Sequence, residues 1–359
     1  MSSDFRVAVV DPGGSPGHHR MEAIDPAAES ADGYHHSPVE LCAFAACTGG
    51  SFHGCRNRRD VITAGSCQGV PDDTSAVLLL VDRMRQCLRL LDQYQQRGKT
   101  VVITYTEAGT MQIAKMLGTP ARLRGFFEVC RRADGAIAVT PEGLPVLHGA
   151  GARHVEFIPN PCPVDIPGWD FSVPADRRAG ILIGTTYFHA NERNHLAALV
   201  SIRSLAESLG ERVTVVINMS DPYDRRMREA LQSWWRTDSL RVVEGPLTFF
   251  AFLRLMANHK LVFQLDQAAG CGQIGGLALL CRIPCIGGYG GHERVIFPHL
   301  SGFGRSTGEL VSIAARLLQD PSEAEDAVGT AVRLASEQAA YGVVRSRLET
   351  LFATVGRRA

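Results

Sequence analysis

Residues 261–295 place glycine-rich turns between apolar segments, an arrangement that can hold a phosphate-bearing ligand. The order indicates a buried strand, a glycine turn from Gly270 to Gly276, an apolar helix, a short strand at 284–286 and a second glycine turn that ends near Glu293. Glycine lets the backbone approach a ligand closely, and a helix N-terminus presents N–H groups to an anion. Tight packing of a helix on a strand needs the same glycines, so both interpretations stay open.

Titratable side chains follow two other expected strands. The loop after the first strand contains Gly14, His18 and His19, and one of these histidines could titrate near neutral pH. Glu107 follows the strand at 100–104 and could act as a base toward an acceptor. The competing interpretations are solvent-exposed histidines and a carboxylate that accepts a hydrogen bond from a loop N–H.

Cysteines that lie near histidines raise the question of a zinc site. The chain has 10 cysteines, of which Cys42, Cys47, Cys55 and Cys67 lie close in sequence to several histidines. Their spacing is irregular and includes no CxxC pair, whereas structural zinc sites use tighter spacing. Free thiols are therefore the favoured interpretation, and we expect no metal site. The first twenty residues lack an apolar signal core, so we expect a cytoplasmic protein, whose thiols stay reduced.

Length and charge limit the classes of function. A chain of 359 residues suits two domains better than one core. The 37 Lys and Arg residues balance the 37 Asp and Glu residues, and no long basic run occurs, so a nucleic-acid partner is not expected. The apolar run at 76–81 is far too short to cross a bilayer, and no other run reaches transmembrane length.

Strands and helices alternate along most of the chain. Strand-like runs in each half are followed by helical patterns, which predicts an α/β protein with two doubly wound, Rossmann-like domains facing a cleft. We place an N-terminal domain at 1–167, a C-terminal domain at 168–345, and a C-terminal helix at 346–359 that packs back on the N-terminal domain. Residues 21–75 show no regular pattern, and we expect loops and one or two short elements there.

Residues 133–165 resemble the end of the N-terminal domain of a GT-B glycosyltransferase, of the family 4-like kind related to sucrose synthase and the bacterial mannosyltransferases. In that family a strand with Ile-Pro-Asn-Gly leads into the crossing to the nucleotide-sugar domain. The corresponding residues here are Ile158 to Pro161, so Pro161 stands in the glycine position. The resemblance extends weakly over most of 76–355 and implies the two-domain GT-B fold.

The same resemblance covers the glycine-rich stretch and shows a divergence at the donor site. The residues that match the family's donor motif are Gly270, Gly272, Ala278 and Pro284. Ala269 and Leu277 stand where the family has two acidic residues, and neither side chain can accept a hydrogen bond. Arg282 stands where the family has the glycine before the proline. The resemblance is therefore to a divergent member that lacks the acidic pair.

The resemblance also implies which residues meet the donor and the acceptor. Arg193 lies near the position of a basic residue that contacts the diphosphate, and Glu293 is the best substitute for the missing acids. An ordinary first-turn charge on a helix is the alternative for both residues. Glu107 lies near where the family often carries a histidine. The implied donor-binding residues are Gly14, Arg193, Gly270, Gly272, Gln273, Gly291 and Glu293, and the candidate catalytic residues are Glu107 and His18.

Taken together, these residues predict a glycosyltransferase that moves a sugar from a nucleotide-diphosphate sugar to an unidentified acceptor. The resemblance implies catalysis without a metal or another cofactor, because that fold neutralises the diphosphate with side chains and helix dipoles. The missing acids favour a first alternative, a non-catalytic GT-B partner or scaffold subunit. A sugar-nucleotide epimerase of the same fold is a second alternative. The expected partners are a nucleotide-sugar donor, an unknown acceptor and, in the scaffold case, another protein.

Overall fold

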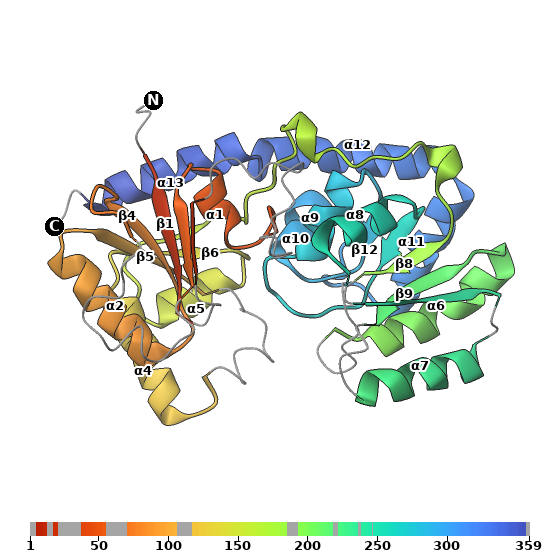
Figure 1. Cartoon of the computed structure of the whole chain (residues 1–359), viewed down its shortest axis with the longest axis horizontal. Coiled ribbons are helices and arrows are strands. Elements are labelled where there is room, and N and C mark those ends of the chain that lie inside the picture. Colours follow the sequence, from red (N-terminus) through yellow and green to blue (C-terminus); the bar gives the residue numbers. More distant parts are fainter. Residues whose placement is uncertain are drawn as a thin grey trace.

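A computed structural model of the chain describes residues 5–12, 17–20, 37–54, 70–105, 117–184, 193–217, 222–235, 238–245 and 247–356. It contains two largely parallel sheets, one in each half of the molecule, and each sheet is covered by helices (Figure 1). This arrangement confirms the predicted α/β class with two Rossmann-like domains. No helix of the described part is both long and apolar enough to span a membrane.

The N-terminal sheet has seven strands in the order β2-β3-β1-β4-β5-β6-β7, and only the β2–β3 pair is antiparallel. Its strands are β1 (Val7–Asp11), β2 (Gly17–Arg20), β3 (Ser51–Gly54), β4 (Ala76–Leu80), β5 (Thr100–Tyr105), β6 (Gly135–Ala138) and β7 (Val155–Phe157). Its own helices are α1 (Ala43–Ala46), α2 (Met84–Gln96), α4 (Pro120–Arg132) and α5 (Gly143–Gly149).

Alternating side chains of these strands build two separate hydrophobic cores, one on each face of the sheet. Leu79 and Ile103 pack with α2, α4 and α5, whereas Leu78 and Val102 pack with α1 and the C-terminal helix. Because both faces are covered, β4 is a continuous aliphatic run and β5 has one at residues 101–103, as expected for buried parallel strands. Gly98, with φ +72°, follows α2 and allows the chain to turn into β5.

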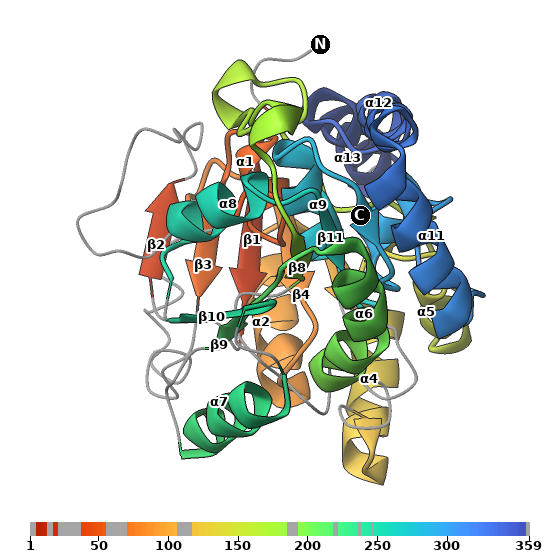
Figure 2. The same cartoon turned by 90° about the vertical axis from the view of Figure 1, so that its right-hand side faces the viewer.

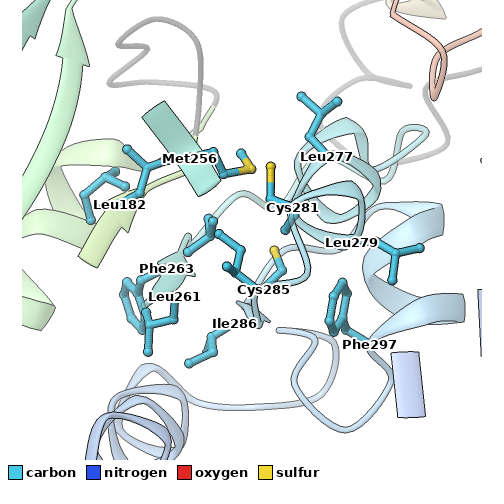
Figure 3. Packing of buried hydrophobic residues seen from close by; sticks show 14 of the residues in the cluster. Leu182, Met256, Leu261, Phe263, Leu277, Leu279, Cys281, Cys285, Ile286 and Phe297 are labelled. Carbon is cyan, nitrogen blue, oxygen red and sulfur yellow. The ribbon is translucent and has the colours of Figure 1, made fainter. Parts of the chain in front are cut away.

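The C-terminal sheet has five parallel strands in the order β10-β9-β8-β11-β12. Its strands are β8 (Ile181–Ile183), β9 (Val213–Ile217), β10 (Leu240–Glu244), β11 (Leu261–Phe263) and β12 (Cys285–Ile286). Its helices are α6 (His195–Leu209), α7 (Pro222–Trp234), α8 (Phe249–Ala257), α9 (Gln273–Leu280), α10 (Gly291–Ile296) and α11 (Thr307–Gln319). Figure 3 shows part of the core of this domain, in which Met256 of α8 and Phe297 belong to the same buried cluster as the side chains of β11 and β12.

The chain crosses between the two domains twice, and the two crossings contact each other. The first runs from β7 to β8 through 3₁₀ turns at Pro167–Trp169 and Ala175–Arg177. The second is the junction of α12 (Pro321–Gln338) and α13 (Tyr341–Gly356), which run end to end along both domains (Figures 1 and 2). The Cys162 N–H donates to the Ala339 carbonyl at 2.7 Å, which joins the crossings. α13 then packs on the N-terminal sheet through residues such as Leu348.

Arg282 explains how the first crossing is held on the C-terminal domain. Its backbone lies in the left-handed region with φ +53°, a conformation that favours glycine. The Arg282 Nε lies 3.4 Å from Oδ2 of Asp170, and its Nη2 donates to the carbonyl of Val164 at 3.5 Å. The side chain therefore adds contacts to the crossing that a glycine at this position would lack.

Candidate functional site

The strand order of the C-terminal sheet reverses between the neighbouring strands β8 and β11. The chain passes from β8 to β9 and β10 on one side, then returns to β11 and β12 on the other. In such sheets, ligands bind outside the carboxyl ends of the strands at the point of reversal. The start of α6, the residues after β11 and the glycine turn before α9 follow these strand ends, and they form the candidate site.

Arg193 lies immediately before α6 and forms an ion pair at this reversal point. Its Nη1 lies 2.5 Å from Oδ2 of Asp266, whose Oδ1 accepts a hydrogen bond from the Ala268 N–H at 2.8 Å. Asn194, with φ +51°, donates from Nδ2 to the carbonyl of Leu265 at 3.0 Å. The Arg193 side chain is 44% exposed, so its guanidinium remains accessible to an anion while Asp266 orients it.

The two glycine turns pack directly against each other. The Gly291 N–H donates to the carbonyl of Gly270 at 2.8 Å. Gly272 has φ +78°, and a Cβ on Gly290 would overlap the backbone of Gly272. The structure therefore brings Gly270, Gly272 and Gly291 together at the start of α9, and the close approach of the turns depends on their lack of side chains.

Glu293 points from α10 toward the two packed glycine turns and is 2% exposed. Its Oε1 accepts hydrogen bonds from the Gly275 N–H at 2.9 Å and from Nε2 of Gln264 at 3.0 Å. Its Oε2 is buried and has no hydrogen-bond partner within the described part of the chain. Burial raises the pKa of Glu293, although both hydrogen bonds oppose the rise. Gly275 lies in the first turn of α9, where the free N–H groups of a helix can bind an anion. The Glu293 carboxyl therefore already uses one of the N–H groups that a bound anion would need.

Buried apolar residues stand at the positions of the two missing acids. Leu277 is fully buried in the C-terminal core, and Ala269 is also buried. Gln273, the first residue of α9, is half-buried. α9 therefore presents no acidic side chain to the candidate site.

α10 also joins the two glycine turns to the N-terminal domain. His292 is fully buried, with Nε2 at 2.8 Å from the Asn160 carbonyl and Nδ1 at 3.2 Å from the Gly272 carbonyl. Burial lowers the pKa of His292, and a neutral imidazole has one N–H, so it can donate to only one of these carbonyls at a time. Arg294 forms an ion pair with Glu142, across the same boundary. These contacts hold both domains together beside the candidate site.

A segment that the sequence analysis left without interpretation, residues 37–42, enters the boundary between the domains. Val39 is fully buried, belongs to the C-terminal core and lies beside Gly276 of α9. Glu40 is half-buried, and burial raises its pKa to about 7 against the opposing charge of Arg193. The sequence shows an acid inside the apolar run 39–46, but only the three-dimensional structure shows that this segment packs against the other domain.

For three of the predicted site residues the structure describes no side chain. Gly14 and Glu107 lie outside the described residues. His18 lies in β2, where its backbone is paired in register with His53 of β3. The roles expected for these three residues stay predictions.

The cysteines of the described residues are free thiols. Cys42 and Cys47 are both buried, and burial raises the pKa of each thiol. Cys55 and Cys67 lie outside the described residues. Within the part of the chain that is described, no group of three or more His, Cys, Asp or Glu side chains could hold a metal ion.

Comparison with protein-family models gives no match, and comparison with curated protein sequences gives none either. Among solved structures, sucrose-phosphate synthase from Thermosynechococcus elongatus is similar, with 15% identity and a TM-score of 0.64 over 99% of this chain and 100% of that chain. HepE from Anabaena in complex with UDP and glucose has 13% identity and a TM-score of 0.65, over 98% and 100%. Trehalose 6-phosphate synthase from Burkholderia multivorans has 7% identity and a TM-score of 0.67, over 98% and 99%. The chain has the GT-B fold.

The GT-B fold agrees with what the resemblance in sequence implies. The structural likeness spans nearly the whole of this chain and of the three compared chains, so it includes both domains and both crossings. At these low identities the likeness establishes the fold, and the reaction has to be argued from the residues of the site.

Proposed function

We propose that this GT-B protein is a glycosyltransferase that moves a sugar from a nucleotide-diphosphate sugar to an acceptor. One observation carries the proposal: Arg193 and two interlocked glycine turns lie at the reversal point of the C-terminal sheet. Such a site offers a positive charge and backbone N–H groups where a diphosphate would depart. HepE, which has a similar structure, was solved with UDP-glucose and with UDP, which supports a nucleotide sugar as the donor class.

The proposed role of Arg193 is to neutralise the diphosphate as its bond to the sugar breaks. In the structure Asp266 holds the guanidinium, and a diphosphate would take over part of this interaction because it carries more charge. We propose that the reaction needs no metal, since Arg193 and the α6 N-terminus supply the electrostatic stabilisation. Gln273, at the start of α9, is the proposed polar contact to the donor.

A second candidate function is a non-catalytic partner or scaffold with the GT-B fold. The observation in its favour is that Leu277 and Ala269 are buried and that Glu293 is committed to Gly275 and Gln264. In this case the fold would be maintained for an interaction with another protein, and the site would have lost its hydroxyl-binding acids.

The test is a calorimetric titration with free nucleotides and a panel of nucleotide sugars, followed by an assay for nucleotide release and sugar products. The glycosyltransferase proposal predicts that a nucleoside diphosphate binds and that at least one nucleotide sugar is turned over. Binding without turnover by any panel member would favour the scaffold, and an epimerised nucleotide sugar would identify an epimerase. Absence of binding by every compound would remove the glycosyltransferase and epimerase functions together.

A further inference from the structure

The first turn of α10 holds the glycine turn that precedes α9. The Gly291 N–H donates to the Gly270 carbonyl at 2.8 Å, and the His292 N–H donates to the Cys271 carbonyl at 3.0 Å. Nδ1 of His292 lies 3.2 Å from the next carbonyl, that of Gly272. Three consecutive carbonyls of the glycine turn therefore face two residues of α10, so the position of the turn is tied to that helix.

The same two residues of α10 also contact the N-terminal domain. A Cβ on Gly291 would lie 2.5 Å from the carbonyl oxygen of Val139, just after β6, so a glycine is needed for this close approach. Nε2 of His292 lies 2.8 Å from the Asn160 carbonyl, in the crossing that follows β7. The imidazole of His292 therefore spans the boundary, with one ring nitrogen beside a carbonyl of each domain.

The ring of His292 is held in place by packing. The residue is fully buried, and a Cβ on Gly276 of α9 would lie 2.6 Å from its Nδ1. In a close-packed interior the ring cannot adopt another orientation unless the surrounding backbone moves. Both nitrogen contacts are therefore properties of how α9, α10 and the crossing pack together.

The distances place the single N–H of the neutral ring on Nε2. The contact with Asn160 is the shorter one, at 2.8 Å, against 3.2 Å for the contact with Gly272. The Gly272 carbonyl also accepts a hydrogen bond from the Gly276 N–H at 3.2 Å, whereas no other described residue donates to the Asn160 carbonyl. A buried carbonyl without a donor costs free energy, so the N–H belongs on the nitrogen that faces Asn160.

We propose that His292 is a positioning residue, an inference that rests on the proposed glycosyltransferase function. Its Nε2–H donates to the Asn160 carbonyl and holds the glycine turn of the proposed donor site in a fixed place relative to the N-terminal domain. When a nucleoside diphosphate binds at this turn, the same hydrogen bond transmits the binding to the crossing that contains Asn160.

Two amide variants separate the two contacts of the ring. In His292→Gln the terminal amide reaches the place of Nε2 and can donate to the Asn160 carbonyl. In His292→Asn the shorter side chain reaches only the place of Nδ1, beside the Gly272 carbonyl. Both variants bury an amide in place of the ring, so they differ mainly in the bond that remains. The control is His299→Asn, at an exposed histidine in the turn after α10.

The measurement is hydrogen–deuterium exchange of the full chain, read by mass spectrometry, without and with UDP. Exchange of a protected amide reports how often its own segment opens. Without UDP, His292→Asn should exchange roughly 2- to 13-fold faster than the wild type in residues 158–164 and 270–276, which is the effect of losing one net hydrogen bond. β4 and β9, inside the two domains, should keep the wild-type rate, and His292→Gln and His299→Asn should keep it everywhere.

The addition of UDP tests whether the bond transmits binding between the domains. UDP should slow exchange in residues 270–276 of all four proteins, because the proposed donor site is intact in each of them. It should also slow exchange in residues 158–164 of the wild type, His292→Gln and His299→Asn, and should leave this segment of His292→Asn unaffected. Equal protection of residues 158–164 in the wild type and His292→Asn would overturn the transmission.

The outcomes without UDP decide the positioning role by themselves. Wild-type exchange throughout His292→Asn would overturn it. Equal acceleration in His292→Gln and His292→Asn would overturn it too, because the ring and not its bond to Asn160 would then hold the boundary. Acceleration that includes β4 and β9 would show a general loss of stability and would also contradict the inference. Absence of any UDP effect in the wild type would overturn the proposed nucleotide donor, and the exchange without UDP would still decide the role of His292.

Discussion

At the scale of single residues, Glu293 combines an acidic side chain with surroundings that disfavour its charge. It is caged by glycines that have no room for a Cβ, and only one of its oxygens is hydrogen-bonded. Burial raises its pKa in the folded chain, so folding favours the protonated carboxyl. The stability that comes with the proton is fully present below the ordinary pKa of 4.5 and is lost as the pH rises through the raised value.

The first prediction is that Glu293→Gln weakens the dependence of stability on pH. Glutamine keeps an oxygen for the Gly275 N–H and cannot ionise, so the variant should lose less free energy of unfolding between pH 5 and pH 8 than the wild type does. Urea unfolding at each pH measures this difference. The control is Glu325→Gln on the exposed side of α12, which should retain the wild-type dependence. An identical pH dependence in wild type and Glu293→Gln would contradict the account of this residue.

The second prediction concerns Gly272, whose φ is +78° and whose missing side chain leaves room for Glu293 and His292. In Gly272→Ala the left-handed backbone alone costs about 1–2 kcal/mol, and the overlap of the new methyl group adds to it. Gly329→Ala is the control, because Gly329 lies inside α12 with no atom within 4 Å of an added Cβ. That control should raise the free energy of unfolding by roughly 0.5–1 kcal/mol. Equal effects of the two substitutions would show that the turn tolerates a side chain.

At the scale of elements, the hydrophobic pattern of the sequence is sufficient to predict a helix or strand that is buried within its own domain. The aliphatic runs at β4 and β5 and the spaced apolar residues of α2 show their burial in the local sequence. The glycine frame at 270–291 could also be predicted, because glycine conformations and the strand–turn–helix order are local properties. Burial that comes from the other domain leaves no local signal, which is why 37–42 could not be interpreted.

Glu293 shows the same limit of prediction from local sequence within the candidate site. Its position after one glycine turn predicted an acid close to the other, and in the structure its carboxyl accepts a hydrogen bond from the Gly275 N–H. The sequence could not show that Gly275 and Gln264, 18 and 29 positions away, occupy its carboxyl group. The contact depends on how α9, α10 and β11 pack, so it is set by tertiary structure.

The third prediction tests the packing of α13 on the N-terminal sheet. Leu348 is fully buried there, so Leu348→Ala should lower the free energy of unfolding by about 2–5 kcal/mol. Thr350→Ala, two residues further along and exposed, should change it by less than about 0.5 kcal/mol. Chemical denaturation of the full chain measures both values. A small effect of Leu348→Ala would mean that α13 does not form part of the N-terminal core.

At the scale of the whole molecule, the two domains meet through a few specific contacts beside the proposed donor site. Val39 enters the C-terminal core, His292 lies between carbonyls of Asn160 and Gly272, and Arg294 pairs with Glu142. Glu40 of the segment 37–42 lies near enough to Arg193 for their charges to interact, and the proposed function assigns Arg193 to the donor. A ligand that binds at the reversal point would therefore contact both domains and couple its binding to their relative position.

We propose that the reversal point of the C-terminal sheet binds a nucleoside diphosphate through Arg193. The direct measurement is the Kd for UDP, by calorimetry, in the wild type, in Arg193→Ala and in the control Arg333→Ala on the exposed side of α12. Loss of a hydrogen bond to a charged group costs about 1.5–3 kcal/mol, so Arg193→Ala should weaken UDP binding by roughly 10- to 150-fold, and Arg333→Ala should leave it unchanged. Equal UDP affinity in the wild type and Arg193→Ala, or no UDP binding to the wild type, would contradict the claim.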